Sequence, residues 1–99
     1  MNTTPNITLK ILADTYGVSR LSPTAPIPSW ISPGGFTSIS RTDEELSILC
    51  LDQKIPHKVC SQKSWRIIKV LGPLDFSLVG ILSSISSILA EVQISIFAV

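Results

Sequence analysis

The last third of the chain carries the pattern that most limits what the chain can fold into. An apolar run from Trp65 to Leu71 leads into a turn marked by glycine and proline, and a second apolar run spans Ile94 to Val99. Between them, apolar residues recur with helical spacing, at positions 78, 81, 82, 85, 88, 89 and 92. This order predicts a strand–helix–strand (βαβ) unit, with Asp75 as the N-cap residue of the helix.

The first part of the chain has the alternation of β-strands. Residues Ile7–Ala13 alternate apolar and polar side chains, Asp14 and Thr15 suit a turn, and Tyr16–Leu21 reads as a return strand. We therefore expect the chain to open with a β-hairpin.

Two further strands are expected at Phe36–Ser40 and Leu46–Leu51. Thr42, followed three residues later by Glu45, fits a capping box, so a single helical turn is predicted between these strands.

Residues 22–35 form a Pro-rich connector. Its four prolines remove backbone donors and fix φ, which excludes a regular helix or a central strand. The connector contains Trp30, for which two interpretations are open. This side chain either anchors the connector on its own sheet or binds a partner.

Composition narrows the functional classes. Apolar residues make up 44% of the 99 residues, which is too apolar for a disordered chain, and a net charge of +1 without a basic block argues against nucleic-acid binding. The uncharged run from Phe76 to Ala90 is shorter than the roughly 20 residues that a membrane span needs. The N-terminus lacks the features of a signal peptide, so a cytoplasmic location is predicted, without membrane partners.

Neither catalysis nor metal binding is supported by the residue pattern. Asp43, Glu44 and Glu45 are consecutive and cannot all face one ion, and Cys50, His57 and Cys60 lack a fourth zinc ligand. No nucleophile–base arrangement is present. We predict a protein that is not an enzyme and has no catalytic residues, metal site or cofactor. The two cysteines are expected to be free thiols, with Cys50 in the core.

The turn after Leu71 has groups suited to a small zwitterion. Backbone N–H groups at a helix N-terminus favour a carboxylate, Asp75 can pair with an ammonium, and Ser77 can donate or accept. Gly72 and Gly80 permit close approach of a ligand. The alternative, that Asp75 is only a helix cap and Gly80 only a packing residue, stays open on residue chemistry alone.

Three segments of the sequence resemble a known family. They are Gly35–Cys50, Trp65–Leu82 and Glu91–Val99, and their most specific parts are Gly72-Pro-Leu-Asp-Phe-Ser77 and Ile94-Ser-Ile-Phe-Ala98. Together they are similar to small bacterial and archaeal ACT-domain proteins of the CASTOR-like type. The similarity extends from about Ile7 to the end of the chain.

This resemblance implies an α+β, ferredoxin-like fold, with a βαβ-based antiparallel sheet and a helix on one face. It implies two ACT-like units, a degenerate β-rich one at 1–64 and an incomplete one at 65–99. It also implies a site for a small effector, typically an amino acid, in the loop before the helix and the strand after it. The residues that correspond to this site are Gly72, Leu74, Asp75, Phe76, Ser77, Gly80, Ile94, Ser95 and Ile96.

The leading functional hypothesis is therefore a regulatory or sensing module that binds an amino acid, either as a homo-oligomer or with another ACT chain. The alternative is a structural or interaction module, or a non-functional truncated remnant, that associates through open strand edges. The resemblance supports this alternative because relatives continue past the last strand with another strand and helix. We accordingly expect a chain truncated at its C-terminus.

Overall fold

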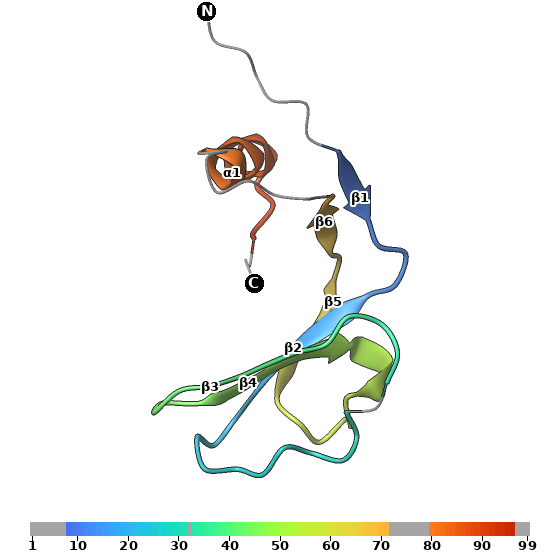
Figure 1. Cartoon of the computed structure of the whole chain (residues 1–99), viewed down its shortest axis with the longest axis vertical. Coiled ribbons are helices and arrows are strands. Elements are labelled where there is room, and N and C mark those ends of the chain that lie inside the picture. Colours follow the sequence, from blue (N-terminus) through green and yellow to red (C-terminus); the bar gives the residue numbers. More distant parts are fainter. Residues whose placement is uncertain (1–7, 32, 72–79, 97–99) are drawn as a thin grey trace, which may run out of the picture. The chain divides into compact units, whose positions relative to one another are not determined.

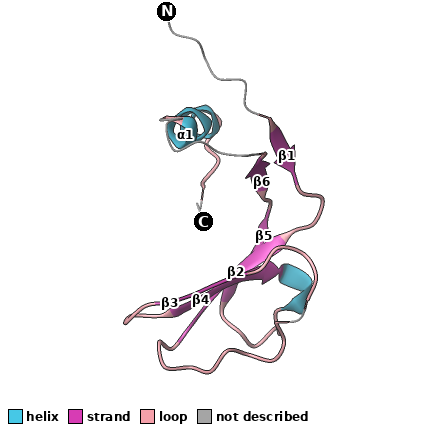
Figure 2. Cartoon of the chain, in the orientation of Figure 1, coloured by secondary structure: helices cyan, strands magenta, loops and turns pink. Residues whose placement is uncertain are grey.

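The computed structural model describes residues 8–31, 33–71 and 80–96. In these residues the elements follow one another in the order shown in Figure 1, and Figure 2 distinguishes helices from strands. The fold is of the predicted α+β class, with two antiparallel sheets. The elements are β1 (Leu9–Ile11), β2 (Tyr16–Leu21), β3 (Ser38–Arg41), β4 (Leu46–Leu51), the 3₁₀-helix η1 (Asp52–Lys54), β5 (Ser61–Trp65), β6 (Ile68–Val70) and α1 (Ile81–Glu91).

The chain forms two compact units. One comprises residues 10–69, and the other combines residues 1–9 with residues 70–99. These units are defined by contacts between residues. The division predicted from the sequence, at 1–64 and 65–99, is of another kind, because it separates two ACT-like units. That division stays a prediction.

The larger unit is built on a four-stranded sheet with the order β3-β4-β2-β5. β2 and β4 pair antiparallel along their whole length, from Tyr16 opposite Leu51 to Leu21 opposite Leu46. The strands predicted at Tyr16–Leu21 and Leu46–Leu51 are confirmed with the same bounds. β3 starts at Ser38, two residues later than the strand predicted from Phe36.

Both faces of this sheet bury apolar side chains, because successive residues of a strand point to opposite sides. One core cluster consists of Tyr16, Val18, Leu49 and Leu51, with Leu12, Trp65 and Ile67 packed against it. The cluster on the other face consists of Leu46, Ile48, Cys50 and Ile55, with Leu21, Ala25, Trp30, Ile31 and Val59 packed against it. The prediction that Cys50 lies in the core is confirmed.

The hairpin predicted at the start of the chain is wrong. β1 pairs with β6, and β2 lies between β4 and β5. The Leu12 N–H donates to the Ile67 oxygen, and the Leu71 N–H donates to the Thr8 oxygen, both at 2.9 Å. β1 is exposed along its length, whereas the first four residues of β2 are buried. A strand buried on both faces requires a central position, which β4 and β5 provide.

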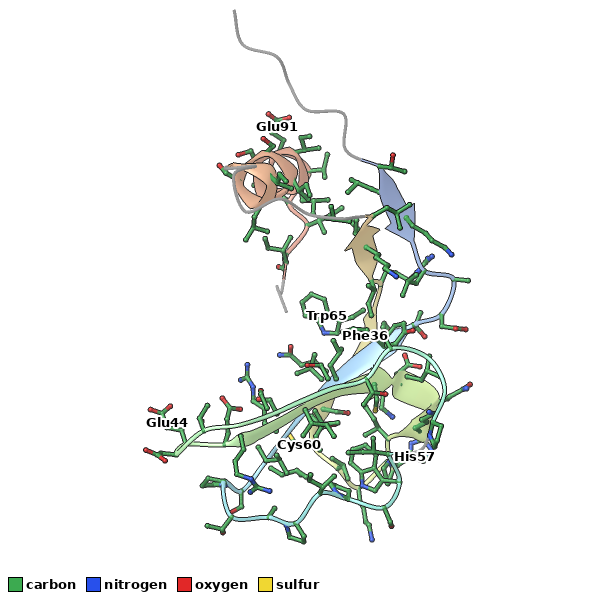
Figure 3. The ribbon with its side chains drawn as sticks, viewed as in Figure 1. Phe36, Glu44, His57, Cys60, Trp65 and Glu91 are labelled. Carbon is green, nitrogen blue, oxygen red and sulfur yellow. The ribbon has the colours of Figure 1, made fainter. Side chains whose placement is uncertain are left out.

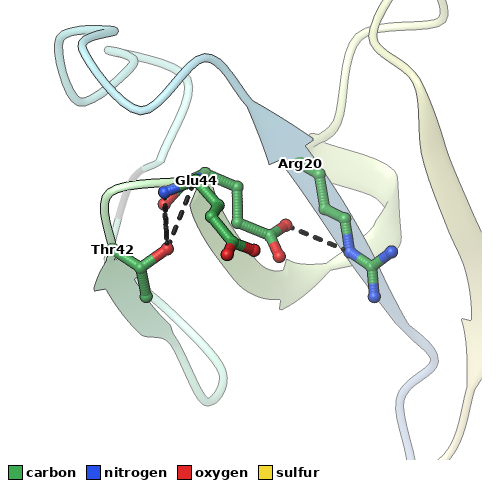
Figure 4. A network of polar contacts seen from close by, with 4 residues as sticks. Arg20, Thr42 and Glu44 are labelled. Atoms are coloured by element: carbon green, nitrogen blue, oxygen red, sulfur yellow. Dashed lines mark hydrogen bonds and ion pairs between the residues drawn. The ribbon is translucent and has the colours of Figure 1, made fainter.

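The link between β3 and β4 is a tight turn and not the predicted helical turn. The Thr42 N–H donates to the Glu45 carbonyl oxygen at 2.9 Å, which continues the β-ladder. Thr42 Oγ1 does accept the N–H groups of Glu44 and Glu45, at 3.1 and 3.2 Å, as a capping residue would (Figure 4). The Glu45 carboxylate, however, pairs with Arg20 at 3.2 Å instead of closing a capping box.

The Pro-rich connector is fixed to the sheet. Its residue Trp30 packs against the cluster around Ile48, so the anchoring interpretation of this tryptophan agrees with the structure. Lys54 Nζ donates to the carbonyl oxygens of Pro33 and Gly34, at 3.1 and 2.9 Å.

Arg41 fastens the earlier part of the same connector. Its Nη2 donates to the Ala25 oxygen at 2.8 Å, and its Nη1 donates to the Pro23 oxygen. These contacts satisfy carbonyl groups that prolines leave without a regular backbone partner.

The single strand predicted at Trp65–Leu71 is wrong: Trp65 is the last residue of β5, Ile68–Val70 forms β6, and the two strands belong to different sheets. Ser64, with φ at 68°, and a register shift between β2 and β5 mark an irregularity just before the break. Arg66, which follows β5, then donates from Nε and Nη2 to the Leu12 oxygen, at 3.1 and 2.8 Å. The break lets the chain leave one sheet and enter the other.

The predicted helix is present, but its ends differ from those expected. α1 begins at Ile81 after the N-cap residue Gly80, so the prediction that Asp75 caps it is wrong, and Asp75 itself lies outside the described residues. Residues 94–96 are not in a strand, which corrects that part of the strand predicted at Ile94–Val99. Residues 97–99 lie outside the described residues.

The end of α1 has both hydrogen bonds of a Schellman motif. The Gln93 N–H donates to the Ala90 oxygen at 3.0 Å, and the Ile94 N–H donates to the Leu89 oxygen at 2.9 Å. Gln93 has φ at 59°, in the left-handed region where this motif usually has glycine. The motif turns the chain out of the helix and prevents it from continuing.

Replacing Gln93 by glycine is expected to stabilise α1 by about 1 kcal/mol, since a residue with a Cβ is disfavoured in the left-handed region. Hydrogen exchange of the α1 amides would measure this change locally. Gln93→Ala, which keeps the Cβ, should give no such gain. Equal protection of the amides in the two variants would contradict the strain at this position.

Candidate functional site

The described part of the predicted effector loop is its last residue, Gly80. This glycine has φ at 90°, and α1 has no side-chain cap and no acidic residue in its first turn. Among the described residues, a Cβ built on Gly80 would have no atom within 4 Å. Glycine is needed at this position for its backbone conformation, and the open space around it does not support a packing role. No side chain of the described residues caps the first N–H groups of α1, and such groups suit an anionic ligand.

Ile94, Ser95 and Ile96, the predicted strand contribution to the site, follow the other end of α1. All three residues are exposed. Gly80 and Val92, the caps of α1, are 12 positions apart, which corresponds to about 18 Å of helix at about 1.5 Å per residue. The structure therefore does not bring Gly80 and Ile94 together.

The other five predicted site residues, Gly72, Leu74, Asp75, Phe76 and Ser77, lie outside the described residues. Their role stays a prediction.

The apolar face of α1 is only partly covered in the described part of the chain, where Ile81, Ile85 and Leu89 are half-buried. No residue of the helix is buried, and Leu82, Ile88 and Val92 are between 56% and 65% exposed. Helices of this length obtain most of their stability from packing of an apolar face. The helix next to the candidate site therefore has apolar surface available for a ligand or for a partner.

A second feature, which the sequence reasoning missed, is a small hollow beside β2 and β5. It has a volume of about 120 Å³ and is lined by Val18, Arg20, Cys60, Ser61 and Gln62. Its only signal in the sequence is Arg20, a charged residue at the end of an otherwise buried strand. The hollow lies within the unit of residues 10–69.

The two cysteines, both free thiols, differ in accessibility. Cys60 is exposed on the segment that leads into β5, where it is labelled in Figure 3, whereas Cys50 is buried. Burial raises the pKa of the Cys50 thiol, nearby Lys54 acts in the opposite direction, and Asp52 adds to the rise. Cys50 is therefore a poor nucleophile at neutral pH.

Neither a metal centre nor a membrane-spanning helix is found in the described residues. Within residues 8–31, 33–71 and 80–96, no three His, Cys, Asp or Glu side chains converge as metal ligands would. In the same residues, no helix has the length and apolar character to cross a membrane.

Comparison with known proteins gives two family matches and one related structure. The ACT domain model matches residues 61–99, and a model described as an N-terminal domain matches residues 14–58. The chain is similar to protein Atu0741 from Agobacterium tumefaciens, whose crystal structure is known. The two sequences are 47% identical, and the two structures superpose with a TM-score of 0.86. The match covers 96% of this chain and 71% of the solved chain. No curated protein matches.

Proposed function

The chain belongs to the ACT domain family, whose members are small-molecule-binding regulatory domains without catalytic activity, and from this premise we propose that it binds a free amino acid and acts as a sensor. The observation that carries the proposal is the ACT match at residues 61–99, which includes β5, β6 and α1. Family membership also implies a ferredoxin-like fold. The cytoplasmic location stays a prediction.

In the proposed mode of binding, the loop before α1 recognises both charged ends of the amino acid. The carboxylate is bound by backbone N–H groups of the loop and of the helix N-terminus, which carry partial positive charge. The Asp75 carboxylate pairs with the ammonium, and Ser77 supplies a neutral donor or acceptor. Leu74 and Phe76 supply apolar contact, and Gly72 and Gly80 leave room for the backbone to approach the ligand.

The segment after α1 would complete the site in the ACT mode of binding. In that mode the effector is held between two ACT domains. The loop can therefore come from one domain, and Ile94, Ser95 and Ile96 from the other. This supports a role for both ends of α1 even though the helix separates them by its length.

Calorimetric titration of the protein with each of the twenty amino acids tests this function. We expect saturable binding of one amino acid or of one chemical group of them. In Asp75→Ala the dissociation constant should rise roughly tenfold to a hundredfold, because a hydrogen-bonded charge pair is lost. Asp43→Ala, which removes an exposed carboxylate from the β3–β4 turn, is the control and should bind like the wild type. Absence of binding for all twenty would contradict the proposal.

The second candidate function is an interaction module. The exposed apolar side chains of α1 favour it, as do the open edges of β3 and β5 in the described four-stranded sheet. Sedimentation over a range of concentrations distinguishes the two functions. Association that is independent of every amino acid would favour the interaction module, and association that an amino acid changes would favour the sensor.

A further inference from the structure

The hollow beside β2 and β5 combines an apolar wall with polar groups that have unused hydrogen-bonding capacity. Val18 and Arg20 are two residues apart on β2 and so share a face, and Gln62 lies directly opposite Val18 on β5. Val18 is 7% exposed, whereas the Arg20 side chain is 65% exposed. The hollow thus has a buried apolar side and a charged rim.

Arg20 is held in place by one edge of its guanidinium group. Its Nε lies 3.2 Å from Glu45 Oε2, an ion pair drawn as a dashed line at Arg20 in Figure 4. That carboxylate oxygen is buried and has no hydrogen bond of good geometry, so the ion pair is what compensates its charge. Because Glu45 occupies only the Nε side, the two Nη groups, with four N–H donors, have no partner among the described residues.

A guanidinium with its two Nη groups free presents the planar pair of donors that a carboxylate accepts most readily. The ion pair with Glu45 limits the rotation of Arg20 and so reduces the entropy that binding would cost. Gln62 adds an amide that can donate to the second carboxylate oxygen or accept from a neighbouring donor. The volume of about 120 Å³ admits only a few heavy atoms.

We propose that this hollow is a binding site for a small carboxylate, in which Arg20 holds the carboxylate, Gln62 hydrogen-bonds to it and Val18 contacts the carbon next to it. The ligand is a small free acid or the carboxylate end of a larger molecule. All residues that line the hollow belong to residues 10–69, and none of them is among the residues of the proposed amino-acid site, so this proposal does not depend on that site. Its affinity is modest, because Glu45 already offsets part of the charge of Arg20.

Cys60 lines the same hollow and provides a chemical readout of the site. Iodoacetate and iodoacetamide both alkylate a thiolate, whose sulfur bonds to the CH₂ carbon while iodide leaves, but only iodoacetate carries a carboxylate. The rate of each reaction at Cys60 can be followed by mass spectrometry of the cysteine-containing peptides. The buried Cys50 serves as an internal reference for folding.

The expected result is a ratio of iodoacetate to iodoacetamide rates at Cys60 that is roughly fivefold higher than the ratio for a free thiol such as N-acetylcysteine amide. Arg20→Gln should return the ratio to that of the free thiol. Lys63→Gln, which removes an exposed cation three residues from Cys60, is the matched control and should keep the wild-type ratio. A wild-type ratio equal to that of the free thiol, or equal losses in the two variants, would overturn the proposal.

A second variant keeps the test valid if Arg20→Gln fails to fold. Gln62→Glu leaves the Arg20–Glu45 pair intact but adds a negative charge to the hollow, and it should lower the ratio below that of the wild type. An unchanged ratio in this variant would count against the site.

Protection of Cys60 from iodoacetamide then identifies the source of the carboxylate. Acetate, glycine and a short peptide with a free C-terminus represent a simple acid, a zwitterion and a chain end. One of them, at millimolar concentration, should slow alkylation in the wild type but not in Arg20→Gln. This result supports the proposal and identifies the class of carboxylate that the hollow binds. Protection by none of the three would refute it.

Discussion

Replacing Ile48 by alanine is expected to lower the free energy of unfolding of the larger unit by about 3–4 kcal/mol. Ile48 is fully buried and belongs to the cluster with Leu46, Cys50 and Ile55. The substitution removes three carbon atoms from a region between the sheet and the Pro-rich connector. The cost combines the lost apolar burial with the cavity that remains, and the pairing of β4 with β2 and β3 limits how far the surroundings can collapse.

Ile39→Ala is the matched control for this prediction. Ile39 lies directly opposite Ile48 in the β3–β4 register, but it is on an edge strand and is 40% exposed. The same chemical change should therefore cost roughly 1 kcal/mol or less. Urea denaturation followed by tryptophan fluorescence measures both variants. Similar losses for the two would mean that burial in the cluster around Ile48 is not what stabilises this unit.

The local pattern of the sequence predicted the central strands well. Leu46–Leu51 is an almost unbroken apolar run, as a strand buried on both faces requires, and its bounds agree with the structure. Pairing was less predictable. β1 and β2 are neighbours in sequence, which favoured a hairpin, but the Leu12–Ile67 hydrogen bond joins β1 to a strand far along the chain. Which strand pairs with β1 depends on which other strands are buried, and the local sequence pattern does not contain this information.

The candidate sites, like the fold, were predictable only in part. The helical spacing after position 78 predicted α1, but the N-cap is Gly80, because its left-handed conformation interrupts the helix where the apolar spacing does not. The hollow around Arg20 could not be found from the sequence, since its groups come from two segments whose register only the fold determines. A single arginine at a strand end is too common to indicate a site.

Trp30→Ala is expected to lower the free energy of unfolding of the larger unit by about 2–3 kcal/mol, somewhat less than for a fully buried tryptophan because Trp30 is partly exposed. The indole is a large apolar contact between the Pro-rich connector and the cluster around Ile48. The described residues of the connector form no strand, so its position depends on this contact and on the hydrogen bonds from Arg41 and Lys54. Without the indole, the connector would be held mainly by exposed polar groups.

Ile27→Ala tests whether the effect belongs to the anchor or to the connector in general. Ile27 is in the same segment but is 58% exposed, so its loss should change stability by less than about 0.5 kcal/mol. Urea denaturation can follow both variants through Trp65, the second tryptophan of the chain. If Trp30→Ala were as stable as the wild type, its indole would contribute little to the fold. The other interpretation of this residue, contact with a partner, would then be the better account of a tryptophan in a Pro-rich loop.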